Sequence, residues 1–421
     1  MGSQLERPIL IAGGGPVGVI AALALAQQGL PVQVFESAQR VDETPRAATT
    51  HAATLEMLAQ LGLLEDVIRH GLLAPLFRIW DRSSGEMVAE FDFGILRDDT
   101  PHPYVVQCDQ HKLVNFAIER LRAFSHATIE FSASVTEVRQ FDDRVEISVH
   151  CGSNTRTITG SYLIGADGGR SMVRRALGIA FEGYTHPERF LVLSTTFDFS
   201  GTYDDCLRNY FSDPEEWCAL FKFSGADGRG LWRLLFPTRA DETDAEALDS
   251  GAIERRLQAF FPKAGEYSVI HRNVYRVHQR VADRFRQGRA FIAGDAAHVN
   301  NPLGGLGLNF GIHDAIELSR LLGSVVRDEA PASALDLYDL RRRPLNFEYV
   351  QRQTIDTKNR MEEKDLNVRT ANFEALRKVA TDPAAHRTYL LRASLIDSVR
   401  NQPRANADTI LLRERRDPAR L

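Results

Sequence analysis

The N-terminal segment 9–36 places the tightest constraint on how this chain can fold. Residues 9–12 are a short apolar run, GGGPVG follows at 13–18, and residues 19–28 are rich in Ala and Leu. A second apolar run at 32–35 ends in the acidic residue Glu36. Strand, glycine turn, helix, strand and acid in this order are typical of a dinucleotide-binding βαβ unit. The sequence therefore predicts a Rossmann-like domain at the start of the chain.

Each residue of this fingerprint has a distinct physical task. Gly13 permits the tight turn, Gly15 lets the backbone approach a pyrophosphate, and Gly18 lets helix and strand pack closely. The N-terminus of the helix expected at 19–28 directs free N–H groups and the positive end of the helix dipole toward phosphates. Glu36 has the spacing of a carboxylate that binds an adenosine ribose and is unfavourable for a 2′-phosphate. FAD or NAD is therefore expected here rather than NADP.

A second glycine-rich stretch, residues 290–314, repeats the strand–turn–helix pattern late in the chain. Its apolar strand leads to the carboxylate Asp295, Pro302 stiffens the turn, and glycines between 304 and 307 precede an apolar helical pattern at 308–322. A bare backbone at a helix N-terminus can face a flat, electron-rich group. A tight connection between strand and helix would show the same features, so this stretch alone leaves both interpretations open.

The remaining patterns predict an α/β fold in which two sheets are interleaved. A strand ending in Asp167 continues the nucleotide-binding layer, and a three-strand meander, with its first strand at 129–138, is inserted into it. Residues 77–93 indicate a hairpin, and 190–238 carry aromatic strands typical of an antiparallel sheet that can roof a pocket. A helix at 335–343 is expected to end at Pro344 within a helical C-terminal region.

We therefore predict a Rossmann-like FAD-binding domain (βαβ with inserted β-meander), interleaved with an antiparallel-sheet substrate domain and followed by a helical C-terminal region. The FAD-binding domain comprises residues 1–76, 104–180 and 270–340. The substrate-binding β-sheet domain comprises 77–103 and 181–269. Residues 341–421 form the C-terminal helices. An inserted meander of this kind occurs in FAD-binding domains.

Composition excludes several classes of function. The net charge of −5 gives no reason to expect nucleic-acid or membrane binding. The four cysteines lack metal-type spacing and a paired pattern, which indicates a reducing compartment. Without a signal peptide or a long apolar run, we expect a cytoplasmic protein with no stable membrane association. The basic C-terminal region is interpreted as solvated surface, with attraction of an anionic cosubstrate as the alternative.

Three motifs now stand in order: GGGPVG at 13–18, GADGGRSMVR at 165–174 and GDAAHVNNPLGGLGLNFGIHDA at 294–315. Together they resemble the single-component FAD-dependent aromatic hydroxylases, the group typified by para-hydroxybenzoate hydroxylase. The resemblance covers about residues 7–325. Two departures fall in the last motif, because Leu306 and His313 stand where Gln is common in the family.

The resemblance also implies which residues bind FAD. Asp295 is expected at the ribityl chain, Pro302 and the loop 304–309 beside the isoalloxazine ring, and Asp167 belongs to a motif associated with both FAD and the nicotinamide cofactor. Gln107 is the alternative to Gln110 at one position. The full set of implied cofactor residues is Gly13, Gly15, Pro16, Gly18, Glu36, Arg46, Gln110, Asp167, Asp295, Pro302, Gly305, Gly307, Leu308 and Asn309.

The family further implies a monooxygenase that hydroxylates a phenolic or hydroxy-heteroaromatic small molecule with NADH or NADPH and O2 through a C4a-hydroperoxyflavin. Because the flavin supplies the redox chemistry, no metal or protein nucleophile is needed. A general base or polar relay is expected near the substrate. The candidates for this role are His51, Tyr210 and His313. The candidates for the substrate pocket are Tyr210, Phe221, Phe223, Trp232 and Pro302.

Other functions of the same fold are weighed against this one. A flavin-dependent halogenase would carry W-x-W-x-I-P, whereas the segment from Trp232 to Pro237 keeps the first Trp and the Pro but lacks the second Trp and the Ile. A flavin-dependent reductase and a non-catalytic FAD-binding regulator are further alternatives. The choice between NADH and NADPH, and between a monomer and a homodimer, stays open.

Overall fold

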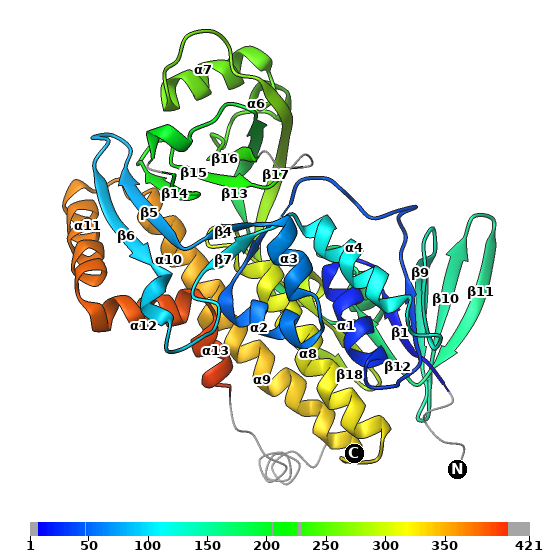
Figure 1. Cartoon of the computed structure of the whole chain (residues 1–421). Helices are drawn as coiled ribbons and strands as arrows, with labels where there is room; N and C mark the ends of the chain where they lie inside the picture. The colour runs from blue at the N-terminus through cyan, green and yellow to red at the C-terminus, as the bar shows by residue number, and fades with distance from the viewer. Residues whose placement is uncertain (1–6, 47, 204, 226–229, 403–421) are drawn as a thin grey trace.

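The glycine fingerprint lies at the centre of a six-stranded sheet in the computed structural model, which describes residues 7–46, 48–203, 205–225 and 230–402 (Figure 1). All neighbouring strands of this sheet are parallel except the edge pair β18–β19. In spatial order the strands are β18 (Arg286–Gln287), β19 (Ala290–Ile292), β12 (Tyr162–Gly165), β1 (Ile9–Ala12), β2 (Val32–Phe35) and β8 (Ala127–Glu130).

Helices cover the six-stranded sheet because its strands are apolar and almost fully buried. Helix α1 (Pro16–Ala26) follows β1 and packs against both α8 (Leu306–Val326) and α4 (Gln110–Leu121). Nearly every residue of α1 is buried, which explains its uniformly apolar sequence. Shorter helices flank this layer: α2 (Ala52–Gln60), α3 (Leu64–His70) and α5 (Met172–Ala176).

A meander stands beside this layer and a small sheet lies within it. The meander consists of β9 (Ser134–Gln140), β10 (Val145–Cys151) and β11 (Asn154–Gly160). The small sheet has the order β3 (Thr49–Thr50), β7 (Val105–Gln107) and β4 (Leu72–Ala74). The prediction of one strand over 129–138 is wrong. Ser132 adopts a left-handed φ of 55°, so the chain turns there and β8 joins the central sheet while β9 joins the meander.

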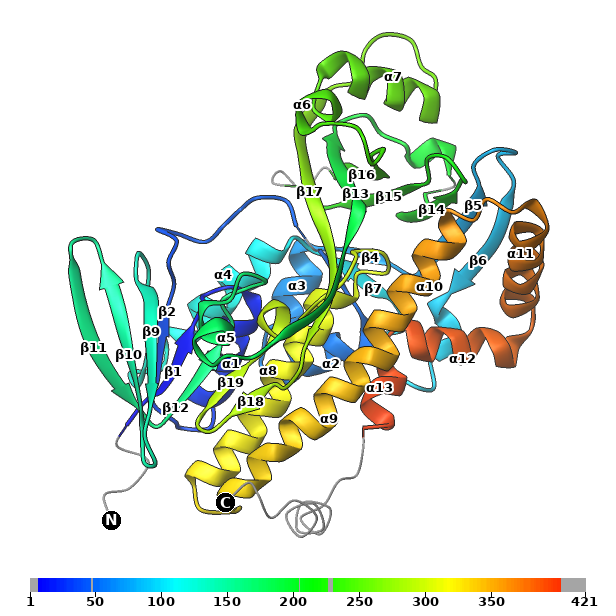
Figure 2. The same cartoon turned by 180° about the vertical axis from the view of Figure 1, so that it is seen from behind.

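An eight-stranded sheet forms the second layer, and every neighbouring pair in it is antiparallel except β14–β5. Its longest strands, β13 and β17, pair from Phe181↔Ala282 to Thr195↔Val269 and form a ribbon that reaches back to the first layer (Figure 2). The order is β20 (His298–Val299), β17 (Val269–Ala282), β13 (Phe181–Thr195), β16 (Leu231–Pro237), β15 (Cys218–Phe223), β14 (Arg208–Ser212), β5 (Leu76–Asp81) and β6 (Met87–Asp92).

The two faces of this sheet bury different partners. One face packs against α7 (Ser250–Phe260), near the short helix α6 (Asp244–Ala247), in an aromatic cluster that includes Trp232. The other face packs against the C-terminal helices, with Tyr210 in the cluster between them. Those helices are α9 (Asp336–Asn346), α10 (Arg352–Met361), α11 (Leu366–Thr381), α12 (Pro383–Ala393) and α13 (Ile396–Arg400).

Pro344 does not end its helix, contrary to the prediction. It lies inside α9, and a π-helical turn, Phe347–Gln351, carries the chain directly into α10. Pro344 removes only the donor to the carbonyl of Leu340, and the N–H of Phe347 still donates to the carbonyl groups of Arg343 and Pro344, so the helical path continues. The described C-terminal region is therefore one nearly continuous helical path laid across the eight-stranded sheet.

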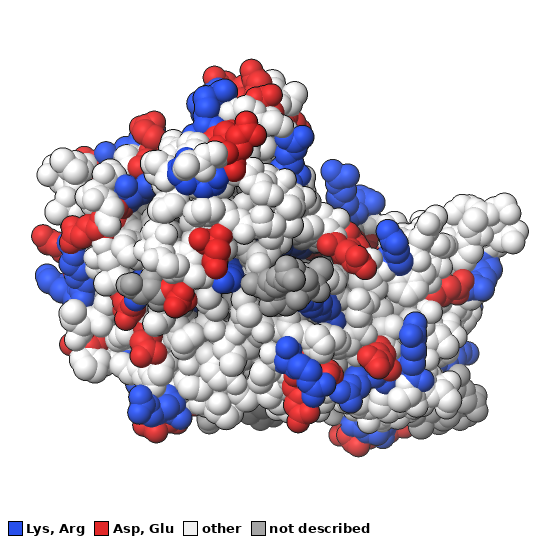
Figure 3. All heavy atoms as spheres, turned by 45° about the horizontal axis from the view of Figure 1, so that its top comes forward, with Lys and Arg blue, Asp and Glu red and all other residues white. Residues whose placement is uncertain are grey.

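The fold as a whole confirms the predicted class: a Rossmann-like layer with an inserted meander, an interleaved antiparallel sheet and C-terminal helices. The predicted division into three domains stays a prediction. None of the described helices combines the length and apolarity needed to cross a bilayer. Positive and negative side chains are interspersed on the face drawn in Figure 3, which shows no continuous field of one sign.

Candidate active site

The cradle at the start of α1 has open space where a pyrophosphate would lie. A Cβ atom built on Gly15 would meet nothing within 4 Å. One built on Gly13 would lie 2.3 Å from the carbonyl oxygen of Ala166, and one on Gly18 only 1.9 Å from that of Gly13. Gly13 and Gly18 therefore serve the packing of strand and helix, whereas Gly15 keeps the approach to the helix N-terminus clear.

The first turn of α1 also has no internal partner for its N–H groups. Gly15 precedes the helix with no side-chain cap, and Pro16 opens it. Glu36 lies at the end of β2 beside this turn, where its carboxylate accepts hydrogen bonds from the N–H groups of Gly14 (2.6 Å) and Ala38 (2.8 Å). The neighbouring strand end thus places a negative group next to a positively polarised helix terminus.

Asp295 follows β19 close to the first turn of α1, because a Cβ built on the neighbouring Gly294 would lie 2.7 Å from Val17 Cγ2. Its side chain is open to solvent, yet enough protein surrounds it that burial raises the pKa of the carboxyl above its ordinary value. His298 and Arg46 act in the opposite direction, so both side chains lie near the carboxylate. Arg46 is exposed and pairs with Asp42 at 2.8 Å. A carboxylate that is desolvated but accessible is suited to binding the hydroxyl groups of a ligand.

The loop between Pro302 and Asn309 is held by glycine conformations and by one amide. Gly304 and Gly305 have φ angles of 89° and 69°, so side chains are disfavoured at both positions. Helix α8 begins at Leu306, two residues earlier than predicted, with no side-chain cap. The first N–H groups of α8 therefore have no side-chain cap, and the preceding glycine backbone carries no side chains of its own.

Asn309 fixes this loop to the segment that carries His51. Its amide nitrogen donates to the carbonyl groups of Thr49 (2.8 Å) and Gly305 (2.7 Å), and its side-chain oxygen accepts from the N–H of His51 (2.8 Å). The amide is fully used within the protein. The role of Asn309 shown by these contacts is to position the loop, while Leu308 beside it is buried.

A buried ionic cluster anchors the same motif from behind. Asp314 accepts hydrogen bonds from Arg342 Nε (2.7 Å), His298 Nε2 (2.6 Å) and the N–H of Gly294 (3.2 Å). Burial alone would raise the pKa of Asp314, but the charges of Arg342 and His298 more than offset it and lower that pKa. The cluster joins both ends of the motif to α9, so the loop between them has a rigid base.

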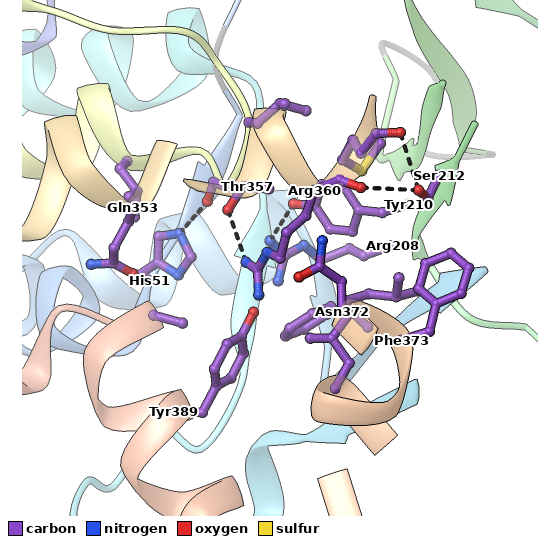
Figure 4. A pocket seen from close by; sticks show the side chains of 18 of the residues that line it. His51, Arg208, Tyr210, Ser212, Gln353, Thr357, Arg360, Asn372, Phe373 and Tyr389 are labelled. Carbon is purple, nitrogen blue, oxygen red and sulfur yellow. Dashed lines mark hydrogen bonds between the residues drawn. The ribbon is translucent and has the colours of Figure 1, made fainter. Parts of the chain in front are cut away.

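A cavity opens between this loop, the eight-stranded sheet and the C-terminal helices (Figure 4). The residues that line it come from three sources. The sheet supplies Phe77, Ile79, Arg208, Tyr210 and Ser212. The glycine loop supplies Leu303, Gly304 and Leu306, and His51 lies beside them. The helices α10, α11 and α12 supply Gln353, Thr357, Arg360, Met361, Asn372, Phe373, Leu376, Tyr389 and Ala393.

His51 lies at the boundary between cavity and loop. Its Nε2 contacts the carbonyl oxygen of Gly304 at 2.8 Å, and because a carbonyl only accepts, Nε2 carries the proton and Nδ1 is left with a lone pair. That Nδ1 is buried and has no hydrogen-bond partner among the described residues. Burial, followed by the charge of Arg208, lowers the pKa of His51 to about 3, so the ring is neutral.

Tyr210 also lines the cavity, and its hydroxyl group lies 3.4 Å from Arg208 Nη2. Burial raises the pKa of Tyr210, so the hydroxyl stays protonated and can relay a hydrogen bond. His313 is placed differently. It does not line the cavity but contacts Thr54 Oγ1 at 3.0 Å, and burial together with Arg342 lowers its pKa to about 3. Its proposed catalytic role is therefore not supported by its position.

The other predicted pocket residues lie at different positions relative to the cavity, and not all of them are on the same face of the sheet. Trp232 lies on the opposite face in the α7 cluster and donates to Asp198 at 2.8 Å, so it does not line this cavity. Phe221 stands behind the lining, edge-on to Tyr210 with ring centroids 5.3 Å apart. Phe223 packs under Arg233 rather than in the cavity. Pro302 precedes the lining residues of the loop but is not one of them.

The remaining predicted cofactor residues are also accounted for. Both carboxylate oxygens of Asp167 are engaged at the start of α5, with Ser171 Oγ at 2.5 Å and the N–H of Met172 at 2.7 Å, so Asp167 caps that helix. Gln110 is the half-buried first residue of α4. Gln107 is fully buried and accepts from Thr49 at 2.6 Å, which places it nearer the loop.

Comparison with known proteins identifies the molecule's relatives. A family model described as "FAD binding domain" matches residues 6–353. Para-nitrophenol 4-monooxygenase from Pseudomonas sp. strain WBC-3 is 34% identical over 390 residues, which cover 91% of this chain and 94% of that protein. The chain belongs to the FAD-dependent aromatic hydroxylases. 6-Hydroxy-3-succinoylpyridine 3-monooxygenase from Pseudomonas putida, a second relative, is 33% identical over 84% of this chain and 88% of its own length.

Solved structures support the assignment of the chain to this family. The crystal structure of p-nitrophenol 4-monooxygenase from Pseudomonas putida matches with a TM-score of 0.88 and 32% identity, over 95% of this chain and 99% of that one. A flavin-dependent monooxygenase solved with FAD and substrate shares the fold at 24% identity and a TM-score of 0.78. These relatives are monooxygenases, so the halogenase, reductase and regulator alternatives lose their support.

The residues present fit FAD. The open Gly15, the uncapped start of α1 and the carboxylate of Glu36 match the needs of a pyrophosphate and a ribose. The accessible carboxylate of Asp295 and the bare start of α8 match those of a polyol chain and an electron-rich ring edge. The two halves of the site are far apart in the sequence but lie close together in the fold, because α1 packs against α8.

Proposed function

We propose that this enzyme hydroxylates a small phenolic or hydroxy-heteroaromatic compound, with NADH or NADPH as the reductant and O2 as the oxidant. The proposal rests on the cavity that Gly304 and Leu306 line. The short loop that contains these two residues belongs to the expected FAD site and also forms one wall of this largely apolar cavity. The names of two relatives, a nitrophenol and a hydroxypyridine monooxygenase, support this class of substrate.

In this proposal the protein binds and orients, while reduced FAD supplies the oxygen-activating chemistry. Gly15 and Glu36 hold the adenosine end, and Asp295 holds the ribityl chain. The uncapped N-terminus of α8 stabilises negative charge at the ring edge through its N–H groups, as in an oxyanion hole. Arg46 and Gln110 are proposed to make further contacts with the cofactor.

The cavity walls give the substrate its orientation. Phe77, Ile79 and Leu303 provide apolar contact, and the polar groups converge near Gly304, where His51 Nδ1 and the Tyr210 hydroxyl are found. We propose that the substrate hydroxyl group lies at this polar end, beside His51 and Tyr210. The enclosed walls of sheet and helices exclude water, which limits loss of activated oxygen.

Substrate-stimulated turnover tests the proposal. The enzyme reconstituted with FAD should oxidise NADH or NADPH slowly alone and faster with a suitable hydroxy-aromatic compound from a panel of phenols and hydroxypyridines. The product should carry one additional hydroxyl group or a substituent replaced by oxygen. A protein that binds no FAD, or one whose oxidation of both nucleotides is unaffected by the whole panel, would refute it. The cytoplasmic location and the oligomeric state, monomer or homodimer, stay predictions.

A further inference from the structure

The buried side-chain amide of Gln279 joins the glycine loop to the C-terminal helices. Gln279 lies on β17, and only 3% of the residue is exposed. Its Oε1 accepts at 3.0 Å from the N–H of Asn301, the residue before Pro302. Its Nε2 donates to Gln351 Oε1 at 2.8 Å and to Thr354 Oγ1 at 3.0 Å. One side chain thus connects two segments that are far apart in the sequence.

The partners of this amide fix its orientation. A backbone N–H only donates, so the atom that faces Asn301 is the amide oxygen. Thr354 Oγ1 donates its own proton to the carbonyl group of Val350 at 2.8 Å, so it accepts from Gln279 Nε2. A turned amide would place Nε2 against the N–H of Asn301 and leave buried polar groups unpaired, which is costly. The connection therefore has a single arrangement that satisfies all its members.

On the loop side, this contact holds the start of the segment that is expected at FAD. Asn301 is fully buried, and its side-chain oxygen accepts from the N–H of Leu303 at 3.2 Å. The glycine pair that follows Leu303 has no side chains with which to anchor itself. Asn309 holds the far end of the loop through its own amide. The side chains of Gln279 and Asn309 thus fix the loop at its two ends.

On the helix side, the same contact holds the π-helical turn that leads into α10. Gln351 ends this turn, and its Nε2 also donates to the carbonyl group of Val299 at 3.3 Å, in the strand just before the loop. Thr354 lies one helical turn before Thr357, which lines the substrate cavity. Single π-helical turns inside helices often occur at functional sites. The network therefore lies next to residues that form two walls of the cavity, the loop and α10.

We propose that Gln279 is a positioning residue for the flavin. Through Asn301 it sets where the glycine loop lies against FAD, and through Gln351 and Thr354 it holds α10 in a fixed position relative to that loop. This inference rests on the FAD site and on the cavity that the proposed function uses. The uncapped start of α8 ends the loop, and its N–H groups stabilise negative charge on reduced FAD. A loop released from Gln279 should therefore bind reduced FAD less tightly relative to oxidised FAD.

The reduction potential of bound FAD tests the proposal, because it compares the affinities of the protein for reduced and oxidised cofactor. The FAD-loaded enzyme, without NADH, NADPH or an aromatic compound, is equilibrated with a redox dye of known potential. The variants are Gln279→Met, Gln351→Met and the double variant, because methionine has a similar length and no amide.

Thr195→Val is the matched control. Thr195 is fully buried, and its Oγ1 donates to the carbonyl group of Ser268 at 2.8 Å. It is the last residue of β13, whereas Gln279 pairs with Tyr184 near the start of that strand. The control therefore removes a buried side-chain hydrogen bond from the same sheet, away from the loop and α10.

Gln279→Met should lower the potential by about 30 mV, the shift that corresponds to tenfold weaker binding of reduced relative to oxidised FAD in a two-electron couple. Gln351→Met should lower it by less, since Asn301 keeps its acceptor. The double variant should shift no further than Gln279→Met, because both substitutions break the same connection. Thr195→Val should lower the melting temperature of the FAD-free protein and leave the potential unchanged.

An unchanged potential in FAD-loaded Gln279→Met would overturn the proposal, and so would an equal shift in Thr195→Val or additive shifts in the double variant. Thermal unfolding and flavin content show whether each variant is folded and loaded. If Gln279→Met does not fold, Gln351→Met decides: a lowered potential supports the proposal and an unchanged one overturns it. Because no turnover is measured, an enzyme that shows these potentials but hydroxylates nothing would refute the proposed function and leave this inference standing.

Discussion

Replacing Gly15 by Ala should separate cofactor binding from folding. The added methyl group would lie in open space, and the φ of −70° at this position is ordinary for alanine. The free energy of unfolding of the FAD-free protein should therefore change by less than about 1 kcal/mol. The same methyl group lies where a pyrophosphate must approach the start of α1. Loss of one charge-assisted hydrogen bond, about 1.5–3 kcal/mol, would weaken FAD binding about 10- to 100-fold.

Gly18→Ala is the matched control for this prediction. Its Cβ would lie 1.9 Å from the carbonyl oxygen of Gly13, so strand and helix must move apart, at a cost of about 1–3 kcal/mol. Thermal unfolding of the FAD-free proteins and calorimetric titration with FAD would measure both effects. Gly15→Ala should keep its melting temperature and lose FAD affinity, and Gly18→Ala should lose melting temperature. An unchanged dissociation constant for FAD in Gly15→Ala would refute the assignment of the cradle.

Three further predictions follow from buried or charged groups. Asp314→Asn leaves Arg342 buried without a carboxylate and should destabilise the enzyme by about 3–5 kcal/mol, seen as a lower melting temperature. Glu36→Gln should reduce the FAD retained per polypeptide about tenfold, read from absorbance after dialysis, and should also lower the stability of the FAD-free protein by about 1.5–3 kcal/mol, because one oxygen that accepts from Gly14 or Ala38 becomes a donor. The pKa values of His51 and His313 are lowered to about 3 in the folded protein, whereas these histidines become protonated near pH 6.5 in the unfolded chain. The folded state should therefore lose stability as the pH falls from about 6.5 toward 3. His313→Gln should make the accompanying decline in melting temperature shallower.

The cofactor half of the site could be predicted from sequence because its constraints are local. A Cβ on Gly18 would lie 1.9 Å from the carbonyl oxygen of Gly13 in the same turn, and Gly13 itself has a left-handed φ of 104°. The same holds for the left-handed Gly304 and Gly305 before α8. Where the backbone adopts a conformation that favours glycine, a glycine appears in the sequence and can be recognised there.

The substrate half could not be predicted in the same way, because it depends on which surfaces meet. Strand alternation in β16 shows that Trp232 and Arg233 face opposite sides, but not which side packs against α7 and which against the cavity. No local pattern in the sequence marks Arg208 as a buried residue, yet only 3% of it is exposed. The lining from α10 to α12 comes from a region interpreted as solvated surface, and only the packing of the folded chain brings it against the sheet.

Transfer of oxygen from isotopically labelled dioxygen tests the central claim most directly. The FAD-loaded enzyme is given NADH or NADPH, labelled O2 and a hydroxy-aromatic compound that stimulates nucleotide oxidation, and the product is analysed by mass spectrometry. The account predicts that the product carries one atom of label for each nucleotide oxidised, with any shortfall recovered as hydrogen peroxide. A product whose new oxygen comes from water, or one formed equally well without O2, would contradict it.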